Sequence, residues 1–470
     1  MLPWLVLLFT TFLTASARAE PLALTVDFAK PKGTIRALHG INKGPLAPGG
    51  LLDLTEAQRA LGIPSTRLHD CHWPYPDVVD MHVVFPDLRA DPERAESYDF
   101  TRTDAYVAAV KRTGAAIVYR LGESIEHEEP RRFVHPPASA ERWAAACLGV
   151  IRHYNDGWAN GTRHGIRYWE IWNEPENRPA MWSGTDEQYF ELYRTTARAV
   201  KGRWPDLRIG GPSVGNPGAL AEGELRPTEF VTRFLEMCRR DAVPLDFFSW
   251  HCYTADPHEL VLRARGIRRL LDTHGFTTTE SHLNEWNYLP ANSWAGVSRK
   301  ATPAARQRFA DEMAGSHGAA FIAAALIELQ DAPVDTCNLF HGETGVFGIF
   351  DEHGVPLKNY HALRAFHALA ETNARVETRG AIAGELAIAA ALDRERRVAT
   401  ILISNFAHTS PELNLSLAGL PSTRTAEVRT LDAQRDFTPA DRSPIPDANG
   451  TMILKLPAPA VAWIELRWDP

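Results

Sequence analysis

The chain has 470 residues, of which 44% are hydrophobic and 23% are charged, a composition typical of a globular protein with more than one domain. Its 50 basic and 58 acidic residues leave a net charge of −8. This balance argues against nucleic acid or an anionic membrane surface as the main partner.

The first 19 residues predict a signal peptide. They contain an apolar run of about a dozen residues, too short to span a bilayer, and Ala17-Arg18-Ala19 fits a signal-peptidase site with cleavage after Ala19. No Lys or Arg precedes the run, so an uncleaved anchor is the alternative. Cleavage predicts a secreted or periplasmic protein with no membrane contact afterwards.

Eight short apolar segments alternate with amphipathic ones between residues 35 and 370, which predicts an α/β fold with a parallel (β/α)8 TIM barrel. The predicted strands are 35–42, 65–70, 115–122, 166–174, 207–214, 246–253, 280–286 and 335–342. Helical patterns between them include 186–203, 227–240 and 303–328. Thr185-Asp186-Glu187 is a plausible cap for the first of these helices.

Beyond residue 371 the pattern changes to short alternating strands separated by turn residues, which is typical of a β-sandwich. The segment 22–30 also alternates, so we expect it to add a strand to that sandwich. Five cysteines, an odd number, show no spacing typical of a disulfide framework. The predicted organisation is a signal peptide (1–19), an N-terminal strand (20–34), a catalytic barrel (35–372) and a β-sandwich (373–470).

Polar residues end several predicted strands at the edge where a parallel barrel places its chemistry. They are Arg67 and His69 on the second strand, Asn173-Glu174-Pro175 on the fourth, His251-Cys252-Tyr253 on the sixth and Asn284-Glu285-Trp286 on the seventh. Two carboxylates on facing strand ends suit cleavage of a glycosidic bond, in which one protonates the leaving oxygen and the other attacks the anomeric carbon. The acid needs a pKa raised toward neutrality, whereas the nucleophile must stay ionised.

The motifs "WEIWNEPE" and "LNEWN" resemble those of glycoside hydrolase clan A, and specifically family 39, which contains β-xylosidases and α-L-iduronidases. "LHGINKGP" (38–45) and "FGIFDEHGVPLKNYHALRAFHAL" (347–369) are similar to further segments of that family. The family also has a flanking β-sandwich built from both termini. The resemblance therefore covers most of the chain after the signal peptide.

The resemblance implies that Glu174 is the acid/base and Glu285 the nucleophile of a retaining mechanism. Asn173 would then bind the sugar 2-hydroxyl and Tyr253 the nucleophile, while His251 would line the site. Clan members also hold an arginine near the nucleophile, which Arg67 matches.

Other positions depart from the family pattern. Phe340, His341 or Trp286 must supply the sugar floor that many clan members build from a tryptophan on the eighth strand. Lys43 stands where a xylosidase-like motif has asparagine, and the segment 70–87 is long and aromatic. Lys43 suits either a substrate carboxylate or an internal ion pair.

Each candidate also has a structural interpretation. Glu174 could belong to a buried ion pair and Arg67 to the barrel interior. We expect Glu170 to pair with a basic residue inside the barrel and Glu176 to lie in a loop. We expect Glu280 to lie at the start of its strand, at the end of the barrel opposite the site. Core positions are the alternative for His251, Tyr253, Tyr168 and Trp169. A metal site at 69–72 is a further alternative, although no ligand pair elsewhere in the chain has the typical spacing. The charged segment 123–132 is either a solvated loop or the rim of a sugar subsite.

The sequence therefore predicts a retaining glycosidase that needs no cofactor or metal and acts on an oligosaccharide or polysaccharide. Exo-action on xylose-type β-glycosides comes first. Uronic acid, arabinose or galactose linkages and endo-action are alternatives, and a non-catalytic glycan-binding protein is a remote one. Nothing in the sequence predicts the oligomeric state.

Overall fold

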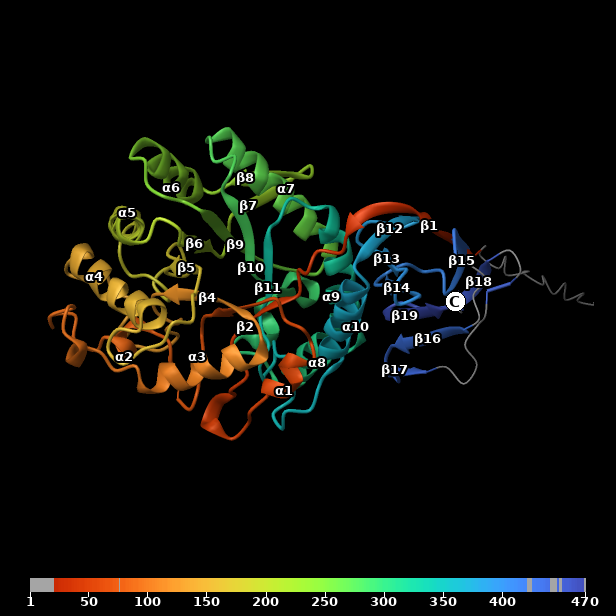
Figure 1. Cartoon of the computed structure of the whole chain (residues 1–470), viewed down its shortest axis with the longest axis horizontal. Coiled ribbons are helices and arrows are strands. Elements are labelled where there is room, and N and C mark those ends of the chain that lie inside the picture. The colour runs from red at the N-terminus through yellow and green to blue at the C-terminus, as the bar shows by residue number, and fades with distance from the viewer. Residues whose placement is uncertain (1–20, 76, 421–424, 440–445, 448–449, 469–470) are drawn as a thin grey trace, which may run out of the picture.

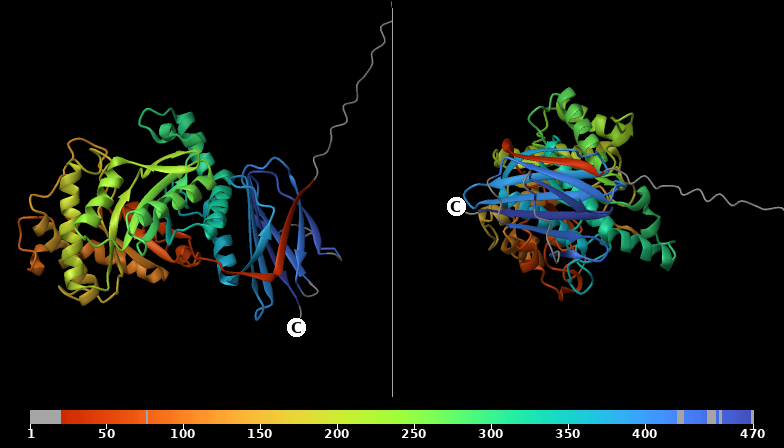
Figure 2. Two further views of the ribbon diagram at one scale, coloured as in Figure 1. Left: turned by 90° about the horizontal axis from the view of Figure 1, so that it is seen from above. Right: turned by 90° about the vertical axis from the view of Figure 1, so that its right-hand side faces the viewer.

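Eight parallel strands close into a barrel, and a nine-stranded sheet lies beside it, beyond the helices that cover one side of the barrel (Figures 1 and 2). The computed structural model describes residues 21–75, 77–420, 425–439, 446–447 and 450–468. The predicted signal peptide lies outside these residues. Among the described residues, no helix has both the length and the apolar character needed to cross a membrane.

The barrel confirms all eight predicted strands, in the order β10-β11-β2-β3-β4-β5-β6-β9. They are β2 (Gly40–Asn42), β3 (Ser65–Leu68), β4 (Ala116–Leu121), β5 (Tyr168–Ile171), β6 (Arg208–Val214), β9 (Phe247–Thr254), β10 (Glu280–Tyr288) and β11 (Thr336–Leu339). A ribbon of β7 (Gly218–Ala221) and β8 (Glu224–Pro227) follows β6. Because all eight strands run the same way, the loops after them gather at one edge, which is where a parallel barrel holds its site.

Helices surround the barrel because each carries an apolar stripe that packs against the strands. They are α1 (Thr55–Arg59), α2 (Met81–Val84), α3 (Thr101–Thr113), α4 (Ala140–Ile151), α5 (Asp186–Arg203), α6 (Glu229–Arg240), α7 (Pro257–Thr273), α8 (Pro303–Ala314), α9 (Ser316–Glu328) and α10 (Lys358–Thr372). Thr185 caps α5 as predicted, because its hydroxyl accepts from the backbone N–H of Gln188 while the Gln188 side chain accepts from the N–H of Thr185.

The prediction of one helix over 303–328 is wrong, because the chain breaks at Gly315 into α8 and α9. Gly315 is extended, with φ −87° and ψ −164°. A Cβ at this position would lie 2.4 Å from the backbone oxygen of Asp311, so the break depends on the missing side chain.

The C-terminal strands form one curled mixed sheet, in the order β17-β16-β19-β14-β13-β12-β1-β15-β18. They are β12 (Ala374–Arg379), β13 (Leu386–Asp393), β14 (Val398–Asn405), β15 (Glu412–Ala418), β16 (Thr425–Leu431), β17 (Asp436–Pro439), β18 (Thr451–Lys455) and β19 (Ala460–Arg467), joined by β1 (Leu22–Thr34). β1 lies between β12 and β15, so the N-terminal strand does enter this sheet. The predicted boundaries at 34/35 and 372/373 fall after β1 and between α10 and β12.

The central strands of this sheet are buried on both faces. Ile388 and Ile401 enter a core that the curled sheet encloses, whereas Ala389 and Leu402 join the barrel-side core, where α9 and α10 pack. The continuous apolar runs of β13 and β14 follow from this double burial. The helices that cover the barrel thus also attach the sheet to it.

Candidate active site

Glu174 lies in a turn beyond the end of β5. The strand stops at Ile171, because Trp172 and Glu174 both adopt left-handed backbone conformations, with φ 69° and 44°. The prediction that the strand continues to Glu174 is therefore wrong. The backbone N–H of Glu174 donates to the carbonyl oxygen of Ser213, 3.0 Å away, which fixes the turn against β6.

Glu285 points into the barrel because of a bulge in β10. The pairing of β10 with β9 shifts between Leu283 and Glu285, so Asn284 is the extra residue. In a regular strand neighbouring side chains face opposite sides, but here Asn284 and Glu285 both reach the barrel interior. The Asn284 amide donates to Glu170 and Ser213, at 2.6 and 2.9 Å.

Trp286 lies away from the site. Its side chain is completely buried, and its ring centroid is 6.4 Å from that of Phe321 on α9, outside the barrel. The prediction that Trp286 contacts the sugar is therefore wrong. The strand alternation that resumes after the bulge turns Trp286 outward.

His251 stands between the two carboxylates. Its Nδ1 lies 2.8 Å from Oε1 of Glu174, and its Nε2 lies 3.7 Å from Oε2 of Glu285 and 2.8 Å from the hydroxyl of Ser213. One oxygen of each carboxylate and one nitrogen of the imidazole all lie within 4.8 Å of one another. Two acids, one in the turn after β5 and one on β10, and one base thus form a single compact group.

Tyr253 and Arg67 hold Glu285 from two sides. The Tyr253 hydroxyl donates to Oε1 of Glu285 over 2.6 Å, and the Arg67 guanidinium donates to Oε2 over 3.2 Å. Arg67 also donates to Glu170 over 2.7 Å, which confirms that Glu170 pairs with a basic residue inside the barrel. Arg67 therefore has both the structural contact and the site contact that the sequence left as alternatives.

Asn173 and Ser213 complete the network. Oδ1 of Asn173 accepts from Arg67 at 2.6 Å and from Ser213 at 3.0 Å, which leaves its Nδ2 without a partner among the described residues. Ser213 contacts Asn173, Arg67, His251 and Asn284, although no sequence pattern singled it out. Ser213 has φ 57° and sits at a bulge in β6, neither of which has a local sequence signal.

The pKa values of the site residues shift in directions that differ from the prediction. Burial would raise the pKa of Glu174, but the hydrogen bond and charge of His251 and the bond from Asn177 bring it below its ordinary value. Burial would lower the pKa of His251, but the charge of Glu285 and the bond to Glu174 raise it. Burial and the charge of Glu174 raise the pKa of Glu285, although His251, Arg67 and Tyr253 oppose the shift. The expected raised pKa of Glu174 is thus absent, because His251 competes for the proton.

Glu176 lies in the loop after β5, as predicted, and this loop packs against the site. Its Oε1 accepts from the backbone N–H groups of Gly215 and Asn216, whereas its Oε2 is buried without a partner among the described residues. Burial and the charge of Glu174 raise the pKa of Glu176 to about 7. The site therefore contains a third carboxyl group, on the loop after β5.

Lys43 is engaged in an internal ion pair. Its ammonium lies 3.5 Å from Glu343 and 5.2 Å from the ring centroid of Phe340. Glu343 is completely buried, and burial raises its pKa to about 7 against the opposing charge of Lys43. Of the two interpretations of Lys43, the structure shows the ion pair.

His69 lies beside the network without bonding to either carboxylate. Its Nε2 is 3.4 Å from Asp70, and its Nδ1 is buried without a partner among the described residues. Burial lowers the pKa of His69 well below its ordinary value, so the ring is neutral. The loop of Asp70 is fixed by the N–H of Ile125, which donates to its carboxylate over 3.2 Å.

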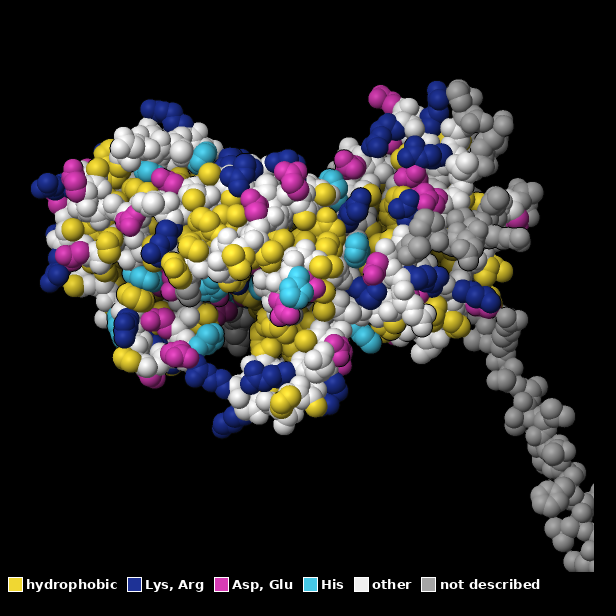
Figure 3. Space-filling model, turned by 90° about the horizontal axis from the view of Figure 1, so that it is seen from below, with side chains coloured by type: hydrophobic (Ala, Val, Ile, Leu, Met, Phe, Trp, Pro, Cys, Tyr) yellow, Lys and Arg dark blue, Asp and Glu magenta, His cyan; other side chains and the backbone are white. Residues whose placement is uncertain are grey.

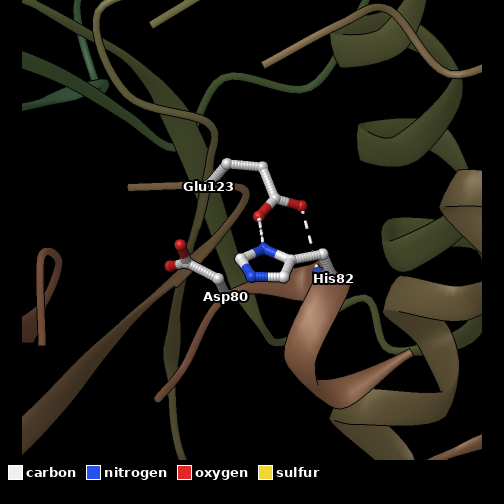
Figure 4. Close-up of side chains that lie close together, drawn as sticks. All are labelled: Asp80, His82 and Glu123. Carbon is white, nitrogen blue, oxygen red and sulfur yellow. Dashed lines mark hydrogen bonds and ion pairs between the residues drawn. The ribbon is translucent and has the colours of Figure 1, made fainter. Parts of the chain in front are cut away.

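Among the described residues, two groups of side chains have the types and spacing of metal ligands. One is the Glu174, His251 and Glu285 group, and the other is Asp80, His82 and Glu123 (Figure 4). In the second group, Asp80 already accepts from Arg120 over 2.5 Å and from the backbone N–H of Ser124 over 2.6 Å. A guanidinium is bound to one carboxylate of each group, Arg120 to Asp80 and Arg67 to Glu285. Because its positive charge repels a metal cation, neither group suits a metal ion. The five cysteines are all buried and unpaired.

Comparison with known proteins gives consistent matches. The family described as Glycosyl hydrolases family 39 matches residues 54–409. A β-xylosidase of Geobacillus stearothermophilus is 30% identical over 313 residues, which cover 59% of this chain and 58% of that protein, so the chain spans less than two thirds of its relative's length. Among solved structures, a glucosidase from Croceicoccus marinus matches with a TM-score of 0.78 at 25% identity, over 96% of this chain and 100% of that one. A family 39 β-xylosidase from Caulobacter crescentus matches with a TM-score of 0.69 at 18% identity, over 95% of this chain and 100% of that one.

Proposed function

The chain belongs to glycosyl hydrolase family 39, and on this premise we propose that it is a retaining glycosidase. The observation that carries the proposal is the pair Glu174 and Glu285, with an oxygen of each within 4.8 Å, at the carboxyl edge of the barrel. Retaining enzymes hold their two carboxyl groups about 5–5.5 Å apart, whereas inverting enzymes leave room for a water at roughly 6.5–9.5 Å. The separation therefore favours attack by a carboxylate.

Glu285 is the nucleophile in this proposal. Tyr253 and Arg67 both donate to its oxygens, and such donors stabilise the anion that attacks the anomeric carbon. The attack forms a bond from Glu285 to the sugar and breaks the glycosidic bond. The leaving oxygen takes a proton from Glu174.

Glu174 is the acid/base, with His251 as its proton partner. The pKa of His251 is raised and that of Glu174 lowered, so the pair holds one proton across the 2.8 Å hydrogen bond. The proton passes to Glu174 as the leaving oxygen approaches. Bonding of Glu285 to the sugar then removes the charge that raised the pKa of His251. In the second step a water gives a proton to Glu174 and bonds to the anomeric carbon, while the bond from Glu285 to the sugar breaks and the Glu285 carboxylate is restored. The Glu174 side chain is 17% exposed and that of Glu285 is 9% exposed, so Glu174 is the more open of the two to that water.

The proposed substrate is a β-glycoside of a xylose-type sugar, since the relative of 30% identity is named a β-xylosidase. In this proposal the Nδ2 of Asn173, which has no partner among the described residues, donates to a sugar hydroxyl next to the reacting carbon. A β-glucoside is the second candidate, favoured by the structural match to a glucosidase over 96% of the chain. Export from the cytoplasm stays a prediction that depends on residues 1–19.

The first experiment is hydrolysis of a panel of aryl glycosides: β-xyloside, β-glucoside, β-galactoside, α-L-arabinosides and α-L-iduronide. We expect one strong activity, on the β-xyloside or the β-glucoside, with a first-formed sugar of retained configuration by NMR. Inversion would exclude the double displacement, and no hydrolysis of any aryl glycoside or oligosaccharide would favour a binding protein.

The two carboxylates are then tested separately. Glu285→Gln should abolish turnover with an unchanged melting temperature, because the amide cannot form the glycosyl ester. Glu174→Gln should slow substrates with poor leaving groups far more than activated aryl glycosides. Equal losses on both kinds of substrate would contradict the acid role.

A further inference from the structure

The segment 289–302, which we name the rim segment, follows β10 and lies beside the site. It stands out from the barrel at the teal part of the chain in Figure 2, and the space-filling view shows a hollow beside a projecting lobe (Figure 3). Asn292 accepts from the backbone N–H of Ala255 over 2.6 Å, which ties the segment to the end of β9. A Cβ on Gly296 would lie 2.5 Å from Phe309, so the segment packs closely on α8. The rim segment is therefore anchored at both sides of its tip.

Trp294 is the exposed aromatic residue of the rim segment. Its side chain is 50% exposed, and its ring lies edge-on to Tyr253 with centroids 5.0 Å apart. Tyr253 in turn donates to Glu285. Trp294 thus lies one side chain further out from the proposed nucleophile, and half of it is exposed. A tryptophan offers an apolar face for stacking.

The rim segment also meets the opposite side of the barrel mouth. Arg299 donates to the carboxylate of Glu128 over 3.0 Å and to the carbonyl oxygen of His127. These two residues follow β4, which lies four strands from β10 in the closed barrel of eight. Loops from opposite strands therefore touch above the site. Both partners of the ion pair are strongly exposed, at 72% and 85%, so the contact is weak and can open.

We propose that Trp294 stacks on the group that leaves, the aglycone, and that the Arg299–Glu128 contact encloses this subsite so that it takes a short aglycone. This inference depends on the proposed glycosidase function and adds the residue that selects its leaving group. It makes the site a pocket for the end of a chain or for a small glycoside.

The test compares Trp294→Ala with the wild-type protein on the aryl glycoside that the wild type hydrolyses fastest, and on the disaccharide of the same sugar. We expect KM to rise about tenfold for both, equivalent to a loss of ~1.4 kcal/mol, with kcat changed less. The inhibition constant of the free monosaccharide, which fills only the glycone side, should stay within about twofold. Trp294→Phe should restore most of the affinity, and Ile453→Ala, which shortens an exposed side chain on β18, should change nothing.

Several outcomes would overturn the inference while leaving the glycosidase proposal intact. An unchanged KM in Trp294→Ala would be the first. An equal rise in the inhibition constant of the monosaccharide would be the second, because it would place Trp294 at the glycone. A fall in kcat alone would be the third, because it would mean that Trp294 acts through Tyr253. A wild-type protein without hydrolytic activity would instead contradict the proposed function itself. For the enclosure, Arg299→Ala should raise kcat/KM for a tetrasaccharide relative to the disaccharide, and an unchanged ratio would contradict that part.

Discussion

Substitutions at Arg67 can separate the contribution of its ion pairs to the stability of the fold from their contribution to catalysis. Its guanidinium is completely buried and contacts both Glu170 and Glu285. Arg67→Met would leave the buried carboxylate of Glu170 with Asn284 as its donor. Breaking a buried ion pair on one side costs about 3–5 kcal/mol. For a cooperative unit of ~340 residues this predicts a melting temperature lower by about 4–7 °C.

The double variant Arg67→Met/Glu170→Gln removes both charges, and we expect it to recover most of that stability. Activity should not recover, because Glu285 still lacks the guanidinium 3.2 Å away. Burial already raises the pKa of Glu285, and losing Arg67 raises it further. Since the nucleophile must be ionised, the acid limb of the kcat/KM profile should move to higher pH.

The assays are thermal unfolding of the single and double variants and the pH dependence of kcat/KM. A double variant as unstable as Arg67→Met would refute Glu170 as the uncompensated charge. A double variant that recovers both stability and activity would show that Arg67 has only a structural role.

Three further changes test individual contacts. Tyr253→Phe removes a hydrogen bond to a charged group and should lower kcat/KM about ten- to hundredfold. A change within about twofold would contradict this role. Gly215→Ala places a Cβ 2.5 Å from Oε1 of Glu174 and should lower kcat by displacing the Glu174 carboxylate. Gly202→Ala is the control, because a Cβ there meets nothing within 4 Å. Equal kcat values for the two variants would contradict the displacement. Glu176 has a folded-state pKa of about 7 against an ordinary 4.5, so its stabilising contribution is present below 4.5 and is lost as the pH rises through 7. Glu176→Gln should therefore match the wild type in thermal unfolding near pH 4 and exceed it at about pH 8, and an equal difference at both pH values would contradict the buried charge.

The barrel was predictable because its signals are local. Each predicted strand is an apolar run followed by polar residues, and parallel strands bring those ends to one edge. That logic alone brought Glu174, Glu285, His251 and Tyr253 together, with Arg67 among them. These five residues contact one another directly or through a shared partner in the structure.

The errors lie where the backbone departs from the regular pattern. Alternation along an unbulged β10 would place Asn284 and Glu285 on opposite faces, but the bulge brings both inside and turns Trp286 outward. Glu174 and Ser213 take left-handed conformations that no neighbouring residue predicts. Such departures depend on contacts between distant strands and tend to occur at functional sites.

The ion pair of Lys43 with Glu343 bears on which sugar the site accepts. A free buried ammonium would suit the carboxylate of a uronic acid, but this one already faces Glu343 at 3.5 Å. A substrate carboxylate would meet Glu343 as a like charge, and above pH 7 Glu343 is ionised. We therefore expect no hydrolysis of the α-L-iduronide by the wild-type protein. Glu343→Gln, which frees the charge of Lys43, should raise the ratio of kcat/KM for the iduronide over the neutral glycoside. A wild-type preference for the iduronide would mean that the substrate displaces Glu343 and that Lys43 selects the sugar after all.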